Sequence, residues 1–169
     1  MKHSSGAFEQ SYNGQTAVVD AQNQLVIAAE LSQCAADSDQ LTAVLSAAEE
    51  NLGSLPDQVL ADTGYRGEDI FAELADKPID VIVSLGREGK KAAGIDSKKY
   101  PHTAKMAEHL KTESAKRAYS QRKHIVEPPN GWIKRVLGFR EFRMRSYEKC
   151  RCEWKLITAA LNLRRMASL

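Results

Sequence analysis

The chain lacks the features that mark secreted, membrane-spanning and zinc-binding proteins. Its 169 residues include three cysteines, Cys34, Cys150 and Cys152, and none of them forms the CxxC pair of a zinc site. No apolar run approaches the roughly 18 residues that cross a bilayer, and the first four residues lead into no secretory signal. We therefore expect a cytoplasmic protein whose thiols are reduced.

Two catalytic signatures are also missing. The sequence contains neither the nucleophile elbow of an α/β hydrolase nor a glycine-rich phosphate loop. An α/β-hydrolase-like domain with an accidental basic tail is therefore left without support. With 43% apolar and 27% charged residues, the chain is long enough for one ordinary core, and we expect one domain.

Charge is divided unevenly along the chain. Residues 1–110 hold 9 Lys and Arg against 17 Asp and Glu, a net −8, whereas residues 111–169 hold 15 against 5, a net +10. Such a basic segment is what neutralisation of nucleic-acid phosphates requires. A solvated pair of basic helices explains the charge equally well.

Apolar spacing predicts strands first and helices later. Two short β-branched runs suggest an antiparallel hairpin, and Asp37 with Gln40 resembles a capping box for the helix that follows. The expected strands cover 12–20, 24–31, 58–62 and 81–83, and the expected helices cover 38–52 and 68–75. This order indicates an α/β fold with a mixed sheet over residues 12–85.

The rest of the chain is predicted to be a connection followed by helices. Residues 86–103 hold three glycines and two Lys-Lys pairs, which indicates a flexible basic connection. Residues 104–169 form the basic helical part. A helix is expected from Ala104 toward Val126, a break or helix start at Glu127 before two prolines, helix over 128–137, and a last helix over 146–166.

Two distant carboxylates are the strongest candidates for chemistry. Asp62 closes the apolar run of residues 59–61, and Glu127 lies in the basic segment. A carboxylate at the end of a buried strand, joined by a second from a basic segment, is suited to hold divalent metal for phosphoryl chemistry. Asp62 and Glu127 are therefore predicted as catalytic residues and metal ligands.

Several segments resemble bacterial insertion-sequence DDE transposases. The segment Val59 to Tyr65 is similar to the second Asp block of that family, and Tyr119-x2-Arg122 with Glu127-x6-Lys134 is similar to its Glu block. Further similarity lies in residues 12–18, 131–135 and 153–165, in the same order. The resemblance implies a ribonuclease H-like fold, an Asp-Asp-Glu triad, Mg²⁺ or Mn²⁺, and DNA as substrate.

The chain departs from the family pattern in two places. Four residues rather than three separate Arg122 from Glu127, so that Lys123 fills the basic position equally well. The first Asp of the pattern lies ahead of Tyr12, where residues 1–11 contain no Asp. Asp20 is the nearby substitute, although a surface turn is its ordinary role. We therefore expect a fold that is incomplete at its N-terminal strand.

The Glu block also supplies the expected DNA contacts. Tyr119, Arg122, Lys123, Lys134 and Arg135 are predicted to meet the DNA backbone. Lys134 has an alternative role as an ion-pair partner of Glu127, and Tyr119 as a packing residue. His124, in a basic helix, is expected to be solvated.

The resemblance implies metal-dependent DNA cleavage and strand transfer in DNA transposition. Without the first Asp, few protein oxygens hold the metals, and we expect impaired catalysis. The alternative is a non-catalytic DNA-binding or interaction remnant that pairs with intact transposase. Partners are therefore expected to be DNA at element ends and targets, and a second copy or an intact transposase.

Overall fold

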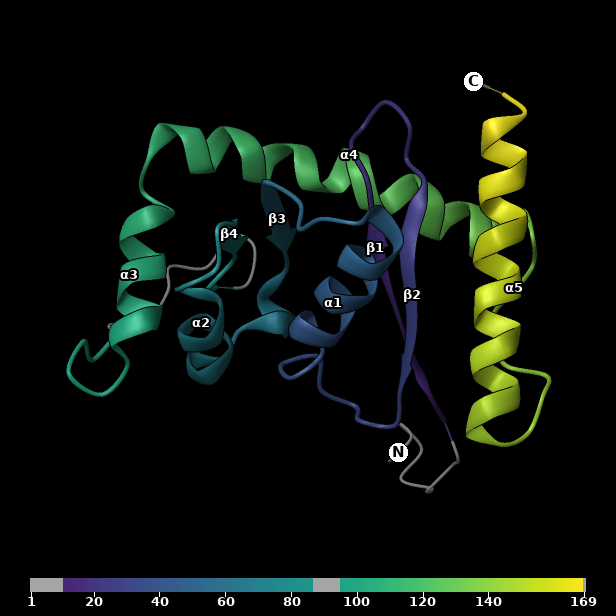
Figure 1. Ribbon diagram of the computed structural model, residues 1–169, viewed down its shortest axis with the longest axis horizontal. Helices are drawn as coiled ribbons and strands as arrows, with labels where there is room; N and C mark the ends of the chain where they lie inside the picture. The colour runs from purple at the N-terminus through teal and green to yellow at the C-terminus, as the bar shows by residue number, and fades with distance from the viewer. Residues whose placement is uncertain (1–10, 87–94, 169) are drawn as a thin grey trace.

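A computed structural model describes residues 11–86 and 95–168 and shows an α/β fold (Figure 1). The strands are β1 (Asn13–Val18), β2 (Val26–Ser32), β3 (Gln58–Ala61) and β4 (Asp80–Val83). The helices are α1 (Leu41–Leu52), the short 3₁₀ helix η1 (Thr63–Tyr65), α2 (Glu68–Leu74), α3 (Pro101–His109), α4 (Glu113–Arg135) and α5 (Tyr147–Met166). The predicted order of strands and helices over residues 12–85 is therefore confirmed.

The described strands form two separate sheets, not the single mixed sheet that we predicted. β1 and β2 make the expected antiparallel hairpin, and β3 pairs with β4 in parallel. Figure 1 shows α1 in front of β1, and α4 crossing the view above β3 and β4 and behind β1 and β2. Hydrophobic patterning identified each strand, but it holds no information on which strand edges meet.

The buried apolar side chains of the described residues form three clusters. The first lies around β3, β4, α2 and α3, and includes Val83, which is 0% exposed. The second lies between β2, the end of α4 and α5, and includes Trp154 and Leu161. The third joins β2 to α1. The two sheets therefore have largely separate cores.

For helix α1 the predicted C-terminal cap is confirmed and the predicted N-terminal cap is wrong. Gly53 caps its carboxyl end with φ of 78°, and its N–H donates to the carbonyl of Glu49 over 2.8 Å. The predicted capping box is wrong, because Gln40 is the N-cap residue and no side chain caps the helix. The side chain of Asp37 instead accepts hydrogen bonds from the side-chain amides of Asn13 and Gln15.

The predicted helix break at Glu127 is also wrong. α4 continues through Pro128 and Pro129, which lack the N–H groups of an unbroken hydrogen-bond ladder. Pro129 is buried, so packing outweighs the local cost. The helical segment is instead interrupted between α3 and α4. Thr112 is the N-cap residue of α4, and its hydroxyl accepts from the N–H of Ala115 over 3.3 Å.

Helix α5 agrees with the predicted last helix. Its inner face buries Cys150, Trp154 and Leu161. The side-chain amide of Asn162 fixes this helix to β2, since it accepts from the N–H of Val26 over 2.8 Å and donates to the Val26 carbonyl over 2.7 Å. α5 is thereby positioned along the β1–β2 hairpin (Figure 1).

The predicted basic connection over 86–103 falls partly outside the described residues, which omit 87–94. Its last residues are helical, because α3 begins at Pro101. Within the described parts of the chain, no helix has the length and apolarity needed to cross a membrane.

Candidate active site at the carboxyl end of β3

Asp62 lies where the sequence placed it, directly after the last residue of β3. Its carboxylate accepts from the N–H of Gly64 over 2.8 Å, and so caps the short helix η1. The side chain is exposed, while Ala61 before it is buried. The strand therefore presents a carboxylate at its solvent-facing end.

A second carboxylate, Asp37, lies beside Asp62. A Cβ atom added at Gly64 would lie 2.9 Å from Oδ2 of Asp37 and 3.0 Å from Oδ1 of Asp62, so these oxygens are within about 6 Å of each other. Oδ1 of Asp37 accepts from the amides of Asn13 over 2.5 Å and Gln15 over 2.6 Å. A side chain at this position would require both carboxylates to move.

Sequence reasoning missed Asp37 as a site residue by assigning it to a helix cap. The available signal was the pair of amides at Asn13 and Gln15, two residues apart on one strand, since alternate strand residues share a face. Nothing in the sequence indicated that these amides would reach Asp37.

Tyr65 and Gln15 form the buried side of the site. The Tyr65 hydroxyl donates to the side-chain carbonyl of Gln15, which is 3% exposed. Burial raises the pKa of Tyr65 far above its ordinary value, and the charges of Asp37 and Asp62 raise it further. Tyr65 is therefore neutral at physiological pH and acts as a hydrogen-bond donor.

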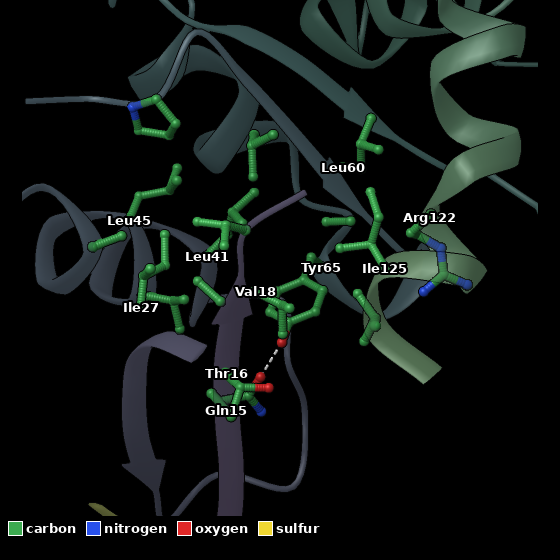
Figure 2. Close-up of a pocket in the computed structure, with 18 of the residues that line it drawn as sticks. Gln15, Thr16, Val18, Ile27, Leu41, Leu45, Leu60, Tyr65, Arg122 and Ile125 are labelled. Atoms are coloured by element: carbon green, nitrogen blue, oxygen red, sulfur yellow. Dashed lines mark hydrogen bonds between the residues drawn. The ribbon is translucent and has the colours of Figure 1, made fainter. Parts of the chain in front are cut away.

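A cavity of about 740 Å³ opens beside these residues (Figure 2). It is bounded by β1, β3, α1 and α4. Its lining includes Asn13 to Asp20 on β1 and beyond it, Gln58 to Asp62 on β3, four buried residues of α1, and Arg122, Ile125, Val126 and Asn130 on α4. The cavity thus connects Asp62 with the first basic residue of the predicted Glu block.

Arg122 reaches this cavity from α4. Its guanidinium lies 5.5 Å from the centre of the Tyr119 ring, a cation–π contact between two predicted DNA-binding residues. The Nε atom is buried and has no hydrogen-bond partner among the described residues. An arginine with a buried, unused donor has capacity for an additional acceptor.

Glu127 lies on a different face of α4. Its side chain is exposed and is not among the residues that line the cavity, in contrast to Asp62 and Arg122. Lys123, Lys134 and Arg135 are exposed on the same helix. In helical projection Lys123 and Lys134 lie on the side of Glu127. The structure therefore brings Asp62 and Arg122 to one cavity, and places Glu127 with two of the predicted DNA contacts.

The two remaining candidates have ordinary roles. The carboxylate of Asp20 accepts from the N–H groups of Gln22 and Asn23, and these bonds, led by the one from Asn23, lower its pKa. Asp20 is thus a turn residue, as its position predicted. His124 is exposed, and its carbonyl accepts from the side chain of Gln24 over 2.8 Å.

The side chains near Asp62 are of the type that binds divalent metals, but there are too few of them to hold a metal pair. Carboxylate oxygens are the ligands that Mg²⁺ and Mn²⁺ prefer. Over residues 11–86 and 95–168, however, no three acidic, His or Cys side chains are close enough to hold a metal ion together. Asp62 and Asp37 alone make an incomplete set for a metal pair.

The whole-chain comparison identifies the family. Residues 2–163 match the family model described as Transposase DDE domain. No curated protein and no solved structure matches the chain. Because the matched segment covers nearly the entire sequence, the chain belongs to the transposase DDE domain family.

Proposed function

We propose that the chain is a part of an insertion-sequence transposase catalytic domain with impaired activity on DNA. The observation that carries the proposal is Asp62, held at the carboxyl end of β3 beside a cavity that also receives Arg122. The family match supports DNA transposition as the parent process. Residues 12–85 would form the sheet core of a ribonuclease H-like fold, and residues 104–169 its basic helical part.

Asp62 and Glu127 are the residues we assign to metal binding. A bound Mg²⁺ or Mn²⁺ pair would activate an attacking oxygen and stabilise the leaving oxygen of a phosphodiester. The chain's own contribution is to orient Asp62 through the Gly64 N–H and to exclude water on the side of Tyr65. Since the described acids make an incomplete set, we expect catalysis by this chain alone to be weak.

The basic helical part is assigned to the DNA backbone. Residues 111–169 carry a net charge of +10, and Lys134 and Arg135 are exposed in the last turn of α4. Exposed cations of this kind bind phosphate through counterion release, so that affinity falls steeply as salt rises. Tyr119, Arg122 and Lys123 extend the proposed contact along the helix.

A second candidate function is a DNA-binding remnant without catalysis, able to pair with intact transposase. The incomplete acid set and the concentration of positive charge in one segment favour it. Both functions predict salt-sensitive DNA binding. They differ in DNA cleavage: the catalytic domain cleaves DNA through Asp62 and Glu127, whereas the remnant does not cleave it.

A nicking assay on supercoiled DNA with Mg²⁺ or Mn²⁺ separates the two. We expect slow metal-dependent nicking by the wild-type chain, and a loss of at least about 100-fold in Asp62→Asn and Glu127→Gln, the scale at which removing an essential catalytic group is felt. DNA binding, measured by gel shift, is expected to persist in both variants.

Two exposed acids provide matched controls. Asp76→Asn and Glu141→Gln make the same chemical change outside the site and are expected to nick DNA at the wild-type rate. Nicking that survives in Asp62→Asn would contradict the catalytic assignment. Salt-sensitive binding with no nicking in any variant would favour the remnant.

A further inference from the structure

The outer face of α5 carries an apolar stripe that no described helix or strand covers. α5 packs on β2 and the end of α4 with its inner face, where Trp154 and Leu161 are buried. On the opposite side lie the three most exposed large apolar side chains of the described residues: Leu156 at 70%, Leu163 at 69% and Met166 at 59% exposed. Figure 1 shows α5 at one end of the molecule. Single exposed apolar residues are ordinary, but three on one helix face indicate a binding surface.

The spacing of this stripe is that of a helix-pairing seam. Five exposed residues of α5 recur at alternating intervals of four and three residues: Cys152, Leu156, Ala159, Leu163 and Met166. We call these five residues the α5 seam. Such intervals place side chains along one line of a helix, and they are the pattern by which two helices pack side by side in a coiled coil. The α5 seam therefore offers a partner helix about two heptads of contact.

A hollow lies at the amino end of the α5 seam. It measures about 700 Å³ and lies between α5 and the segment that leads into it. Its apolar lining includes Cys152 and Leu156 on α5 and Met144 before it, which is itself exposed. Leu163 and Met166, at the carboxyl end of the seam, are not part of this lining. The same helix face therefore has a hollow at one end and protruding side chains at the other.

A face of this shape is complementary to a second copy of itself turned end to end. When Leu163 of one copy lies opposite Cys152 of the other, the spacing of the seam places Met166 opposite Lys149. Cys152 and Lys149 both line the hollow, so the two protruding side chains would enter it. The contact is isologous, because each copy supplies both the hollow and the side chains that fill it, as in a two-fold symmetric dimer.

The charges beside the α5 seam favour this antiparallel direction over a parallel one. In a parallel pair each seam position meets its own equivalent, so that Lys149 would face Lys149, and Glu148 would approach Glu153 of the second copy. Like charges placed opposite each other destabilise paired helices. In the antiparallel alignment Lys149 meets Met166, and Glu153 meets Ala160, so neither charge faces its like.

We propose that the α5 seam is the surface on which a second copy of this chain binds, through an antiparallel, two-fold symmetric contact between the two α5 helices. Leu163 and Met166 of each copy occupy the hollow beside Cys152 of the other. Ala159 lies close to the symmetry axis, where its small side chain lets the helices approach each other. The contact requires neither DNA nor a metal ion, so it goes beyond the proposed function and is tested separately from it.

Sedimentation equilibrium of the whole chain, without DNA or metal, tests the association. We expect a monomer–dimer equilibrium whose dissociation constant rises at least about tenfold in Leu156→Asp, because the new charge would be buried against the partner helix. Leu52→Asp makes the same change at an exposed position of α1 and should leave the equilibrium unchanged. Thermal unfolding verifies that each variant is folded. A wild-type chain that stays monomeric up to about 1 mM would overturn the proposal.

The same two variants test for other occupants of the α5 seam. A folded Leu156→Asp chain that dimerises like the wild type, or like Leu52→Asp, would place the interface elsewhere and overturn the proposal. A monomeric chain whose DNA binding in a gel shift is weakened by Leu156→Asp alone would identify the seam as a DNA contact, which also overturns it. Dissociation by Leu156→Asp in a chain that neither binds nor nicks DNA would support this inference and contradict the proposed function alone.

Disulfide trapping tests the direction of the two helices. In a Cys34→Ser chain Cys152 is the remaining exposed thiol, since Cys150 is buried. Leu163→Cys in this chain should form a covalent dimer with oxidised glutathione, because the antiparallel alignment brings the introduced thiol opposite Cys152 of the second copy. The same variant carrying Cys152→Ser should stay monomeric on a non-reducing gel. Covalent dimers formed by Cys152 alone, or none formed by Leu163→Cys, would overturn the antiparallel contact.

Discussion

The two sheets contrast in what they pack against and in what they leave uncovered. The β3–β4 sheet is parallel, packs on α1, α2 and α3, and contains the most completely buried side chains of the core. The β1–β2 sheet is antiparallel and depends on α5 and the aromatic side chains around Trp154. Among the described residues, neither sheet has a paired strand on the side toward the cavity.

This contrast shows that the proposed site lies at the junction between the two halves. Asp62 comes from one sheet, and the amides that hold Asp37 come from the other. Tyr65 joins them through its bond to Gln15. Changes within one half should therefore affect stability, whereas changes at the junction should affect the site.

The largest effect is expected at Trp154. Its ring packs against Phe139 and Phe142 at centroid distances of 6.0 and 6.3 Å, and its Nε1 donates to the carbonyl of Gln15 over 3.1 Å. Trp154→Ala should lower the free energy of unfolding by about 3–5 kcal/mol, measured by urea denaturation. A loss below about 1 kcal/mol would show that the β1–β2 half does not depend on α5.

A matched pair on the β3–β4 sheet sharpens the comparison. Leu60 and Ile82 are opposite each other in the ladder, but Ile82 is 0% exposed, whereas Leu60 faces the cavity. Ile82→Ala should cost about 2–5 kcal/mol of unfolding free energy, and Leu60→Ala less than about 1 kcal/mol, because Leu60 has fewer neighbours to lose. Equal losses in urea denaturation would mean that the cavity is closed in solution.

The smallest effect concerns pH at the junction. The pKa of Tyr65 is raised by burial and by Asp37 and Asp62, so the folded chain holds this proton more tightly than the unfolded chain. Stability from this group is complete below the unfolded pKa of about 10 and is lost as pH rises above it. The stability difference between wild type and Tyr65→Phe, followed by urea denaturation from pH 8 to 11, should therefore shrink above pH 10. A constant difference would contradict the half-buried position of Tyr65.

The sequence predicted individual elements better than their assembly. The alternation in residues 13–32 and the spacing of apolar residues in α1 and α5 are local signals, and the structure confirms them. The break at Glu127 was wrong because tertiary packing carries α4 through Pro128 and Pro129. The split into two sheets was not predictable, since edge pairing is a long-range property.

Only part of the candidate site could be predicted from the sequence. Asp62 was singled out because a carboxylate at the end of an apolar run is visible in the sequence, and the structure confirms its position directly after β3. Asp37 was missed, because its role depends on the amides of Asn13 and Gln15, and a local capping pattern offered a simpler explanation. Glu127, predicted from its place in the basic segment and supported by the family resemblance, is exposed on α4, and its role in metal binding stays a prediction.

The central claim is that Asp62 is a divalent-metal ligand at the junction of the two sheets, and Mn²⁺-induced broadening of amide signals tests it most directly. Paramagnetic broadening in a ¹H–¹⁵N spectrum should begin at Gly64 and Tyr65, persist in Asp76→Asn, and disappear in Asp62→Asn. Broadening that begins elsewhere, or that is unchanged in Asp62→Asn, would contradict the claim.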